Sequence, residues 1–326
     1  MRLATFRNGG RDGTLALVSA DLTRWSQPPN GICTLQSALD NWGAHEPDLR
    51  MSARRLDEGE EVGAKLDPSM LHAPLPRAYQ WAEGSTYLSH MHRCRRARGV
   101  DLPDEVGSRP IVYQSGSDSF LAPTSPVVLA DIDWGLDIEA TVAVIVDDVP
   151  QGVSADEALG HIKLVVLVND LTLRNLLPRE FATGVGLYQS KPARAVAPVA
   201  VTPQSLGASW AGDRLNARVR CWINDELLGD LDAGADCSFG FGTLIAYMAE
   251  TRSLSAGTMV GSGTVSNLAE SHGVGCIIER RALQVLAGED TLMPYLCPGN
   301  TLRIEAFDSQ GLSLFGAIRQ TVQSPK

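Results

Sequence analysis

The feature that most constrains this chain is an apolar run that ends in a carboxylate. Residues Lys163–Asp170 read KLVVLVND, with no alternation of polar and apolar positions before Asn169 and Asp170. A continuous β-branched run predicts a strand buried on both faces, and therefore a sheet covered on both sides. A carboxylate at the carboxyl end of such a strand stands where ligand sites commonly form. Its oxygen atoms suit Mg²⁺ or Ca²⁺.

A second predicted strand, Glu139–Val149, begins with a carboxylate. Period-two alternation puts Glu139 and Thr141 on one face, and Ala140 and Val142 on the other. A carboxylate that leads an apolar strand can bind a cation, pair with a basic residue or lie in water at the strand mouth. Taken alone, the last interpretation is the simplest.

Candidate basic and acidic partners lie in three other segments. Lys191 stands in an apolar, turn-rich stretch, and Glu279 follows two isoleucines and precedes two arginines, as in a surface ion pair. His90 and His92 lie in SHMHRCRRAR, which is predicted to be a short helix. Two positions apart on a helix they do not share a face, which argues against a two-histidine metal site. In an extended segment they would share one.

The charge balance excludes one large class of partner. The chain has 28 Lys and Arg against 38 Asp and Glu, a net charge of −10, whereas nucleic-acid binding requires a basic surface. No apolar run reaches the length of a membrane span, and the first twenty residues lack the apolar centre of a signal peptide. We therefore expect a cytoplasmic protein that binds a small molecule, with neither nucleic acid nor membrane as partner.

The chain is long enough for one large domain or two unequal ones. Its 326 residues include three prolines within 68–76, a stretch that breaks regular structure and marks the best domain boundary. We predict a small N-terminal β/α domain over residues 1–74 and a catalytic domain over 75–326. Predicted strands outnumber helices and are mostly joined by turns, so the fold class is α+β, β-rich, with a mixed or antiparallel sheet.

Five segments, taken in order, resemble the fumarylacetoacetate hydrolase family. They are EGSTYLSH (83–90), GLDIEATVAVI (135–145), VNDLTLRN (168–175), QSKPARAVAPVAVTP (189–203), and GSGTVS (261–266) paired with GCIIE (275–279). Each motif alone is weak, and their order and spacing carry the resemblance over residues 75–326. It implies a rolled mixed β-sheet, a homodimer, and a divalent metal used on 2-oxo and 1,3-dicarbonyl carboxylic acids.

The resemblance also implies roles for individual residues. Glu139, Asp170 and Thr141 fall on metal-ligand positions, with Mg²⁺ (or Ca²⁺ or Mn²⁺) as cofactor. Glu279 falls on a water-activating dyad whose histidine is His92 by one alignment and His90 by that of the shorter relatives. Arg174 and Lys191 fall on cations that steady a developing enolate, and Tyr87 and Thr264 on substrate-binding positions.

Three positions depart from the family pattern. Thr141 replaces the second glutamate of a Glu-x-Glu pair, Ser85 replaces an aspartate, and Leu177 replaces a glutamine. Two carboxylates with water and substrate still suffice for Mg²⁺. We expect a hydrolase that cleaves a C–C bond in acylpyruvate-like or fumarylacetoacetate-like acids. The alternatives are a decarboxylase, hydratase or isomerase of 2-oxo acids, or a weakly active oxo-acid-binding homologue with a metal site degraded at Thr141.

Overall fold

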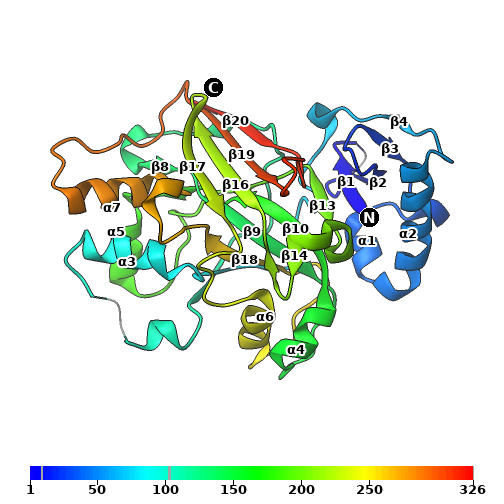
Figure 1. Ribbon diagram of the computed structural model, residues 1–326, viewed down its shortest axis with the longest axis horizontal. Helices are drawn as coiled ribbons and strands as arrows, with labels where there is room; N and C mark the ends of the chain where they lie inside the picture. Colours follow the sequence, from blue (N-terminus) through cyan, green and yellow to red (C-terminus); the bar gives the residue numbers. More distant parts are fainter. Residues whose placement is uncertain (9, 102–103, 326) are drawn as a thin grey trace.

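Two large β-sheets organise the molecule (Figure 1). The computed structural model describes residues 1–8, 10–101 and 104–325. The larger sheet has the order β4 (Ala64–Lys65), β3 (Arg24–Ser26), β2 (Thr14–Val18), β1 (Arg2–Phe6), β13 (Val199–Val201), β10 (Ile162–Asn169), β9 (Ala140–Val146), β18 (Met259–Thr264), β5 (Trp81–Gly84), β6 (Val112–Ser115), and β12 (Ala195–Val196) also pairs with β10.

The second sheet packs against the larger one through a shared apolar cluster. It runs β17 (Glu226–Asp232), β16 (Arg218–Ile223), β19 (Thr301–Phe307), β20 (Ile318–Gln323), β7 (Val127–Val128), and two short ribbons pair β8 (Leu136–Asp137) with β11 (Thr172–Leu173) and β14 (Trp210–Ala211) with β15 (Arg214–Leu215). The helices are α1 (Leu35–Leu39), α2 (Trp42–Glu58), α3 (Leu88–Arg96), α4 (Ala155–Ala158), α5 (Leu177–Thr183), α6 (Phe241–Ala249) and α7 (Ile277–Ala287). The predicted α+β, strand-rich fold class is confirmed.

The two faces of β9 pack into different cores, as the unbroken apolar pattern predicts. Val142 and Val144 join a cluster that includes the inner face of the second sheet. Ala143 and Ile145 join a cluster that contains the buried side chains of α1 and α2. The strand is therefore covered on both sides, which fixes where polar residues at its end can lie.

The N-terminal segment extends the larger sheet instead of forming one of its own. β1 pairs antiparallel with both β2 and β13, so its strands continue those of the remaining chain. The proline-rich stretch lies along β1, where the Thr5 hydroxyl donates to the Pro74 carbonyl at 2.6 Å. The division at residue 74 stays a prediction. Among the described residues, no helix has both the length and the apolarity to cross a membrane.

The antiparallel pairing of β9 with β10 brings the two predicted carboxylates together. Ala140 of β9 pairs with Asn169 of β10 at one end of this strand pair. Glu139 precedes Ala140 and Asp170 follows Asn169, so both lie just beyond that end. The Asp170 amide donates to the Glu139 carbonyl at 2.9 Å, and the Glu139 amide donates to the Asn169 side chain at 3.0 Å. The strand ends thus hold the two acidic residues side by side.

Because the N-terminal strands and helices share a core with β9 and β10, we predict that the whole chain unfolds in one transition. Leu17→Ala empties a site that is fully buried in this core and should lower the free energy of unfolding by about 2–5 kcal/mol. Val62→Ala, at a side chain 79% exposed in the same segment, should change it little. Calorimetry checks this: two separate transitions, with Leu17→Ala moving only one, would contradict it.

Candidate active site

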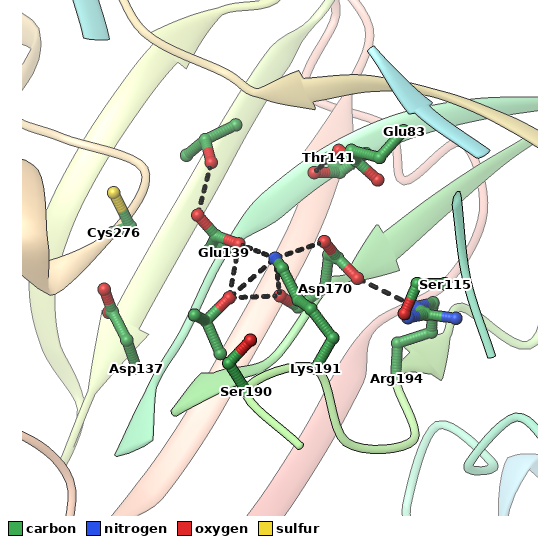
Figure 2. Close-up of polar contacts among 12 residues, drawn as sticks. Glu83, Ser115, Asp137, Glu139, Thr141, Asp170, Ser190, Lys191, Arg194 and Cys276 are labelled. Carbon is green, nitrogen blue, oxygen red and sulfur yellow. Dashed lines mark hydrogen bonds and ion pairs between the residues drawn. The ribbon is translucent and has the colours of Figure 1, made fainter. Parts of the chain in front are cut away.

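The ammonium group of Lys191 lies between the two acidic residues (Figure 2). Its Nζ is 2.7 Å from Glu139 Oε2 and 2.7 Å from Asp170 Oδ2. It also donates at 2.7 Å to the hydroxyl of Thr172, which donates in turn to Glu139 Oε2. Glu139 and Asp170 are buried with it, so the three charged groups form a compact cluster away from bulk water.

All three groups in this cluster keep their charge. Burial alone would raise the pKa of Glu139 and Asp170, but Arg174 and Lys191 lower the pKa of Glu139, and Lys191 with Arg194 lowers that of Asp170. Burial would lower the pKa of Lys191, but the two carboxylates raise it above its usual value. The site therefore contains two carboxylate anions and an ammonium cation at neutral pH.

Arg174 connects this cluster to helix α7. Its guanidinium binds Glu139 Oε1 at 2.5 Å and Asp137 Oδ2 at 2.7 Å. Asp137 also accepts the backbone amides of Ile277 at 2.7 Å and Ile278 at 3.0 Å. Amides in the first turn of a helix have no acceptor within the helix, so Asp137 supplies one for α7. One carboxylate thus anchors both the arginine and the helix that carries Glu279.

Asp170 is held on its other side by groups from β6 and the segment after Lys191. Arg194 is fully buried and donates to Asp170 Oδ1 at 2.7 Å, with its guanidinium 4.8 Å from the ring centre of Trp81. The Tyr113 hydroxyl donates to Asp170 Oδ2 at 2.6 Å. These contacts fix the carboxylate in one orientation.

The loop before Lys191 is held by Glu180 of α5. The carboxylate of Glu180 accepts the backbone amides of Tyr188, Gln189 and Ser190, at distances from 2.7 to 3.2 Å, together with the Ser190 hydroxyl. The Ser190 carbonyl accepts the amide of Leu173, which ties the loop to β11. Lys191 therefore enters the cluster from a loop with few free backbone donors.

A histidine–carboxylate pair lies between α3 and α7, which pack side by side (Figure 1). His90 Nδ1 is 3.1 Å from Glu279 Oε2, and Glu279 Oε1 accepts from Arg93 at 2.6 Å and from Ser266 at 2.7 Å. Burial alone would raise the pKa of Glu279, but its bonds with His90, Ser266 and Arg93 lower it. Glu279 thus remains an anion that can orient the imidazole.

The helical geometry separates the two candidate histidines. His90 is partly buried and faces Glu279, whereas His92 is exposed on α3. Two positions apart on a helix, the side chains point in different directions. The structure therefore brings His90, and not His92, to Glu279, as in the alignment with the shorter relatives.

The histidine pair and the carboxylate cluster form one site. His90, Glu139 and Cys276 each offer a ligand atom within 4.8 Å of the others. Glu139 and Cys276 also form an antiparallel backbone bridge at the start of α7. A small molecule bound to Glu139 and Lys191 would therefore lie next to His90.

The remaining predicted residues take different positions. The Thr264 hydroxyl donates to Glu139 Oε1 at 2.8 Å, inside the cluster. Tyr87 is buried, and its hydroxyl donates to the Ala233 carbonyl at 2.7 Å, which ties the start of α3 to the end of β17. The Thr141 hydroxyl donates to Glu83 Oε1 at 3.1 Å, and no hydrogen bond recorded among the described residues joins it to Glu139 or Asp170.

Several polar residues of this site were not singled out from the sequence, among them Glu83, Tyr113, Thr172 and Arg194. Glu83 and Arg194 lie inside motifs that carry the family resemblance, but a motif does not show which way a side chain points. Tyr113 lies on β6, and its contact with Asp170 depends on the pairing of β6 with β5, which is distant in the sequence. Only the buried position of Asp170 hinted that such partners were required.

The donor set fits a hard divalent cation. Glu139 and Asp170 direct carboxylate oxygens toward one point, which Lys191 occupies with its ammonium group, and the hydroxyls of Thr172 and Thr264 lie beside them. Carboxylate and hydroxyl oxygens are the donors that Mg²⁺, Ca²⁺ and Mn²⁺ prefer. Glu139 and Asp170 are thus the residues that would hold such an ion.

Loss of the Lys191 charge should destabilise the protein. Lys191→Met leaves two buried carboxylates without their shared cation, and removal of one partner of a buried ion pair costs about 3–5 kcal/mol. Arg54→Met, which breaks an exposed pair with Glu58, should have little effect. Urea denaturation in EDTA compares the two variants, and equal midpoints would contradict this description of the cluster.

Known proteins share this fold and parts of this sequence. Oxaloacetate tautomerase YisK of Bacillus subtilis is 26% identical over 249 residues, which are 74% of this chain and 77% of that protein. The solved structure of a putative HpcE protein from Mycobacterium smegmatis superimposes with a TM-score of 0.70 at 20% identity, with all of both chains covered. Maleylpyruvate hydrolase from Sphingobium sp. SYK-6, solved with manganese(II) and pyruvate, gives 0.64 at 16% identity, also over both whole chains.

Family models match nearly the entire sequence. Residues 1–77 match the fumarylacetoacetase N-terminal domain 2, and residues 80–323 match the fumarylacetoacetate (FAA) hydrolase C-terminal model. The second match includes every residue of the cluster and of the histidine pair described above. The chain belongs to the fumarylacetoacetate hydrolase family.

Proposed function

We propose that this chain is a metal-dependent hydrolase that cleaves a C–C bond in an acylpyruvate-like 2-oxo acid. The observation that carries the proposal is the approach of the His90–Glu279 pair to the cluster of Glu139, Lys191 and Asp170. Such a site combines a group that can activate water with charges that can stabilise an enolate. The manganese and pyruvate bound to the maleylpyruvate hydrolase of the same fold support the ligand class.

A divalent ion held by Glu139 and Asp170 would polarise the substrate oxygens and favour the enolate form. The cations of this chain would act with it. Lys191 and Arg174 both contact Glu139. A substrate oxyanion bound next to Glu139 would therefore lie close to both cations. Fixed positive charge is most effective where negative charge develops in a site without bulk water.

His90 would take a proton from water and return it to the product. Burial would lower the pKa of His90, but the neighbouring Cys94 and Cys276 raise it, so the neutral imidazole gains population as the pH rises. Oriented by Glu279, this neutral imidazole accepts a proton from water as the water oxygen attacks the carbonyl carbon remote from the carboxylate end. The C–C bond then breaks, its electron pair forms the enolate of a 2-oxo acid, and the proton passes to the enolate carbon. One water is consumed, and one carboxylic acid and one 2-oxo acid are released.

A second candidate function is a tautomerase, isomerase or decarboxylase of 2-oxo acids. The specific observation in its favour is the similarity to the oxaloacetate tautomerase of Bacillus subtilis. These reactions also pass through an enolate, so Lys191 and Arg174 would act in the same way. They do not need an attacking water, and His90 would then only move a proton on and off carbon.

Substrate assays with Mn²⁺ separate the two candidates. We expect ultraviolet absorbance of acetylpyruvate to fall with release of acetate and pyruvate, and both EDTA and Asp170→Ala to abolish the change. Pyruvate release demonstrates hydrolysis, whereas ketonisation of enol-oxaloacetate without hydrolysis of acetylpyruvate favours the second candidate. Failure to act on either compound with Mn²⁺ present would contradict the proposal.

The two histidines provide a matched pair of variants on one helix. His90→Ala should lower kcat by about 10²–10⁴-fold, the usual contribution of a positioned acid–base group. His92→Ala, at an exposed position, should leave kcat within the error of the wild type. Steady-state kinetics under the same metal conditions check this, and equal losses in both variants would remove the dyad from the mechanism.

A further inference from the structure

Glu83 is a buried carboxyl group that the site described above does not explain. It lies on β5 with 3% of its surface exposed, and its Oε1 accepts from Thr141. Its Oε2 is buried and has no hydrogen-bond partner among the residues that the structure describes. Burial of an unsatisfied polar oxygen is costly, so such a group needs a physical reason.

The backbone is shaped to let Glu83 reach the cluster. β18 lies between β5 and β9, and Gly261 of β18 pairs with Glu83 on one side and Ala143 on the other. A Cβ atom at Gly261 would lie 2.6 Å from Glu83 Oε2, so the carboxyl group extends over the space that glycine leaves free. The side chain thereby crosses a strand and meets Thr141.

The carboxyl group of Glu83 lies beside Thr141, next to the cluster that contains Glu139 and Asp170. Figure 2 shows Glu83 and Thr141 together on the side of Asp170 that is opposite Ser190. Asp170 and Glu139 are both close enough to raise the pKa of Glu83, after the larger effect of burial. The three carboxyl groups therefore share one electrostatic environment, in which a third negative charge requires an additional cation.

We propose that Glu83 is the third carboxylate ligand of the divalent cation that Glu139 and Asp170 bind. This inference rests on the proposed function, because it assigns a ligand to the same metal. It explains the unpartnered Oε2, since an ion would supply the missing partner. It also explains why position 141 can be threonine: the carboxylate comes from β5 across Gly261, and a glutamate at 141 would compete for the same space.

The alternative is that Glu83 only packs against Thr141. A glutamine there would still accept the Thr141 hydrogen bond and would fill the same volume. Glu83→Gln therefore separates the two roles, because it keeps the packing and removes the charge.

The proposal can be tested without any substrate. The full chain is freed of metal with EDTA, the EDTA is removed, and Mn²⁺ is then titrated into the protein by calorimetry. We expect Glu83→Gln to weaken Mn²⁺ binding by at least about tenfold, since even groups that only orient a metal ligand contribute 10–100-fold. Glu305→Gln is the matched control, because Glu305 is a buried glutamate on β19 that binds Arg303. Its Mn²⁺ affinity should equal that of the wild type.

A second experiment moves the carboxylate from position 83 to position 141. It tests the proposal even if Glu83→Gln does not fold. Glu83→Ala with Thr141→Glu should bind Mn²⁺ within about threefold of wild type, because it returns the same charge to the ion from the adjoining position. Glu83→Ala alone should be weaker than this pair. Wild-type affinity in a folded Glu83→Gln overturns the proposal and leaves the proposed function intact. No Mn²⁺ binding by the wild type would instead overturn the metal-dependent function itself.

Discussion

The arrangement of this site depends on a buried ammonium group shared by two carboxylates. Lys191 contacts Glu139 and Asp170 at equal distances, in a place where water does not screen the charges. Two carboxylates so close together repel each other unless a cation lies between them, and the desolvation of all three groups is costly. The antiparallel register of β9 and β10 imposes this proximity, so the protein must supply positive charge at that position.

The rest of the site extends from that cluster through charged contacts. Arg174 links Glu139 to Asp137, which caps helix α7, and α7 carries Glu279 toward His90 on α3. The His90–Glu279 pair is thus connected to the ion pairs that neutralise the cluster. A tautomerase with a related sequence and a hydrolase with a similar fold show that one scaffold can serve different reactions.

The sequence was most informative where one physical pattern dominated. The unbroken apolar run before Asp170 predicted a strand covered on both faces, and the structure shows β10 in that position. The order of the motifs predicted the family, which the family models show. Periodicity could not choose between His90 and His92, because the choice depends on how α3 packs against α7.

Other contacts were beyond the reach of sequence reasoning for a different reason. Glu83 and Tyr113 come from strands that join the sheet through pairings between distant segments, so their approach to Asp170 depends on registers that local patterns do not encode. The role of Gly261 is similar, because its missing side chain matters only when Glu83 lies above it. Thr141 looks like a lost ligand in the sequence, whereas in the structure it is a hydrogen-bond donor to another carboxyl group.

Anomalous scattering from crystals grown with Mn²⁺ and oxalate, an analogue of an enolised 2-oxo acid, tests the central claim most directly. The account predicts one strong manganese peak with oxygens of Glu139 and Asp170 at about 2.0–2.6 Å, and the Lys191 ammonium moved off the line between them. A map with Lys191 still bridging the two carboxylates, and manganese absent there or bound elsewhere, would contradict it.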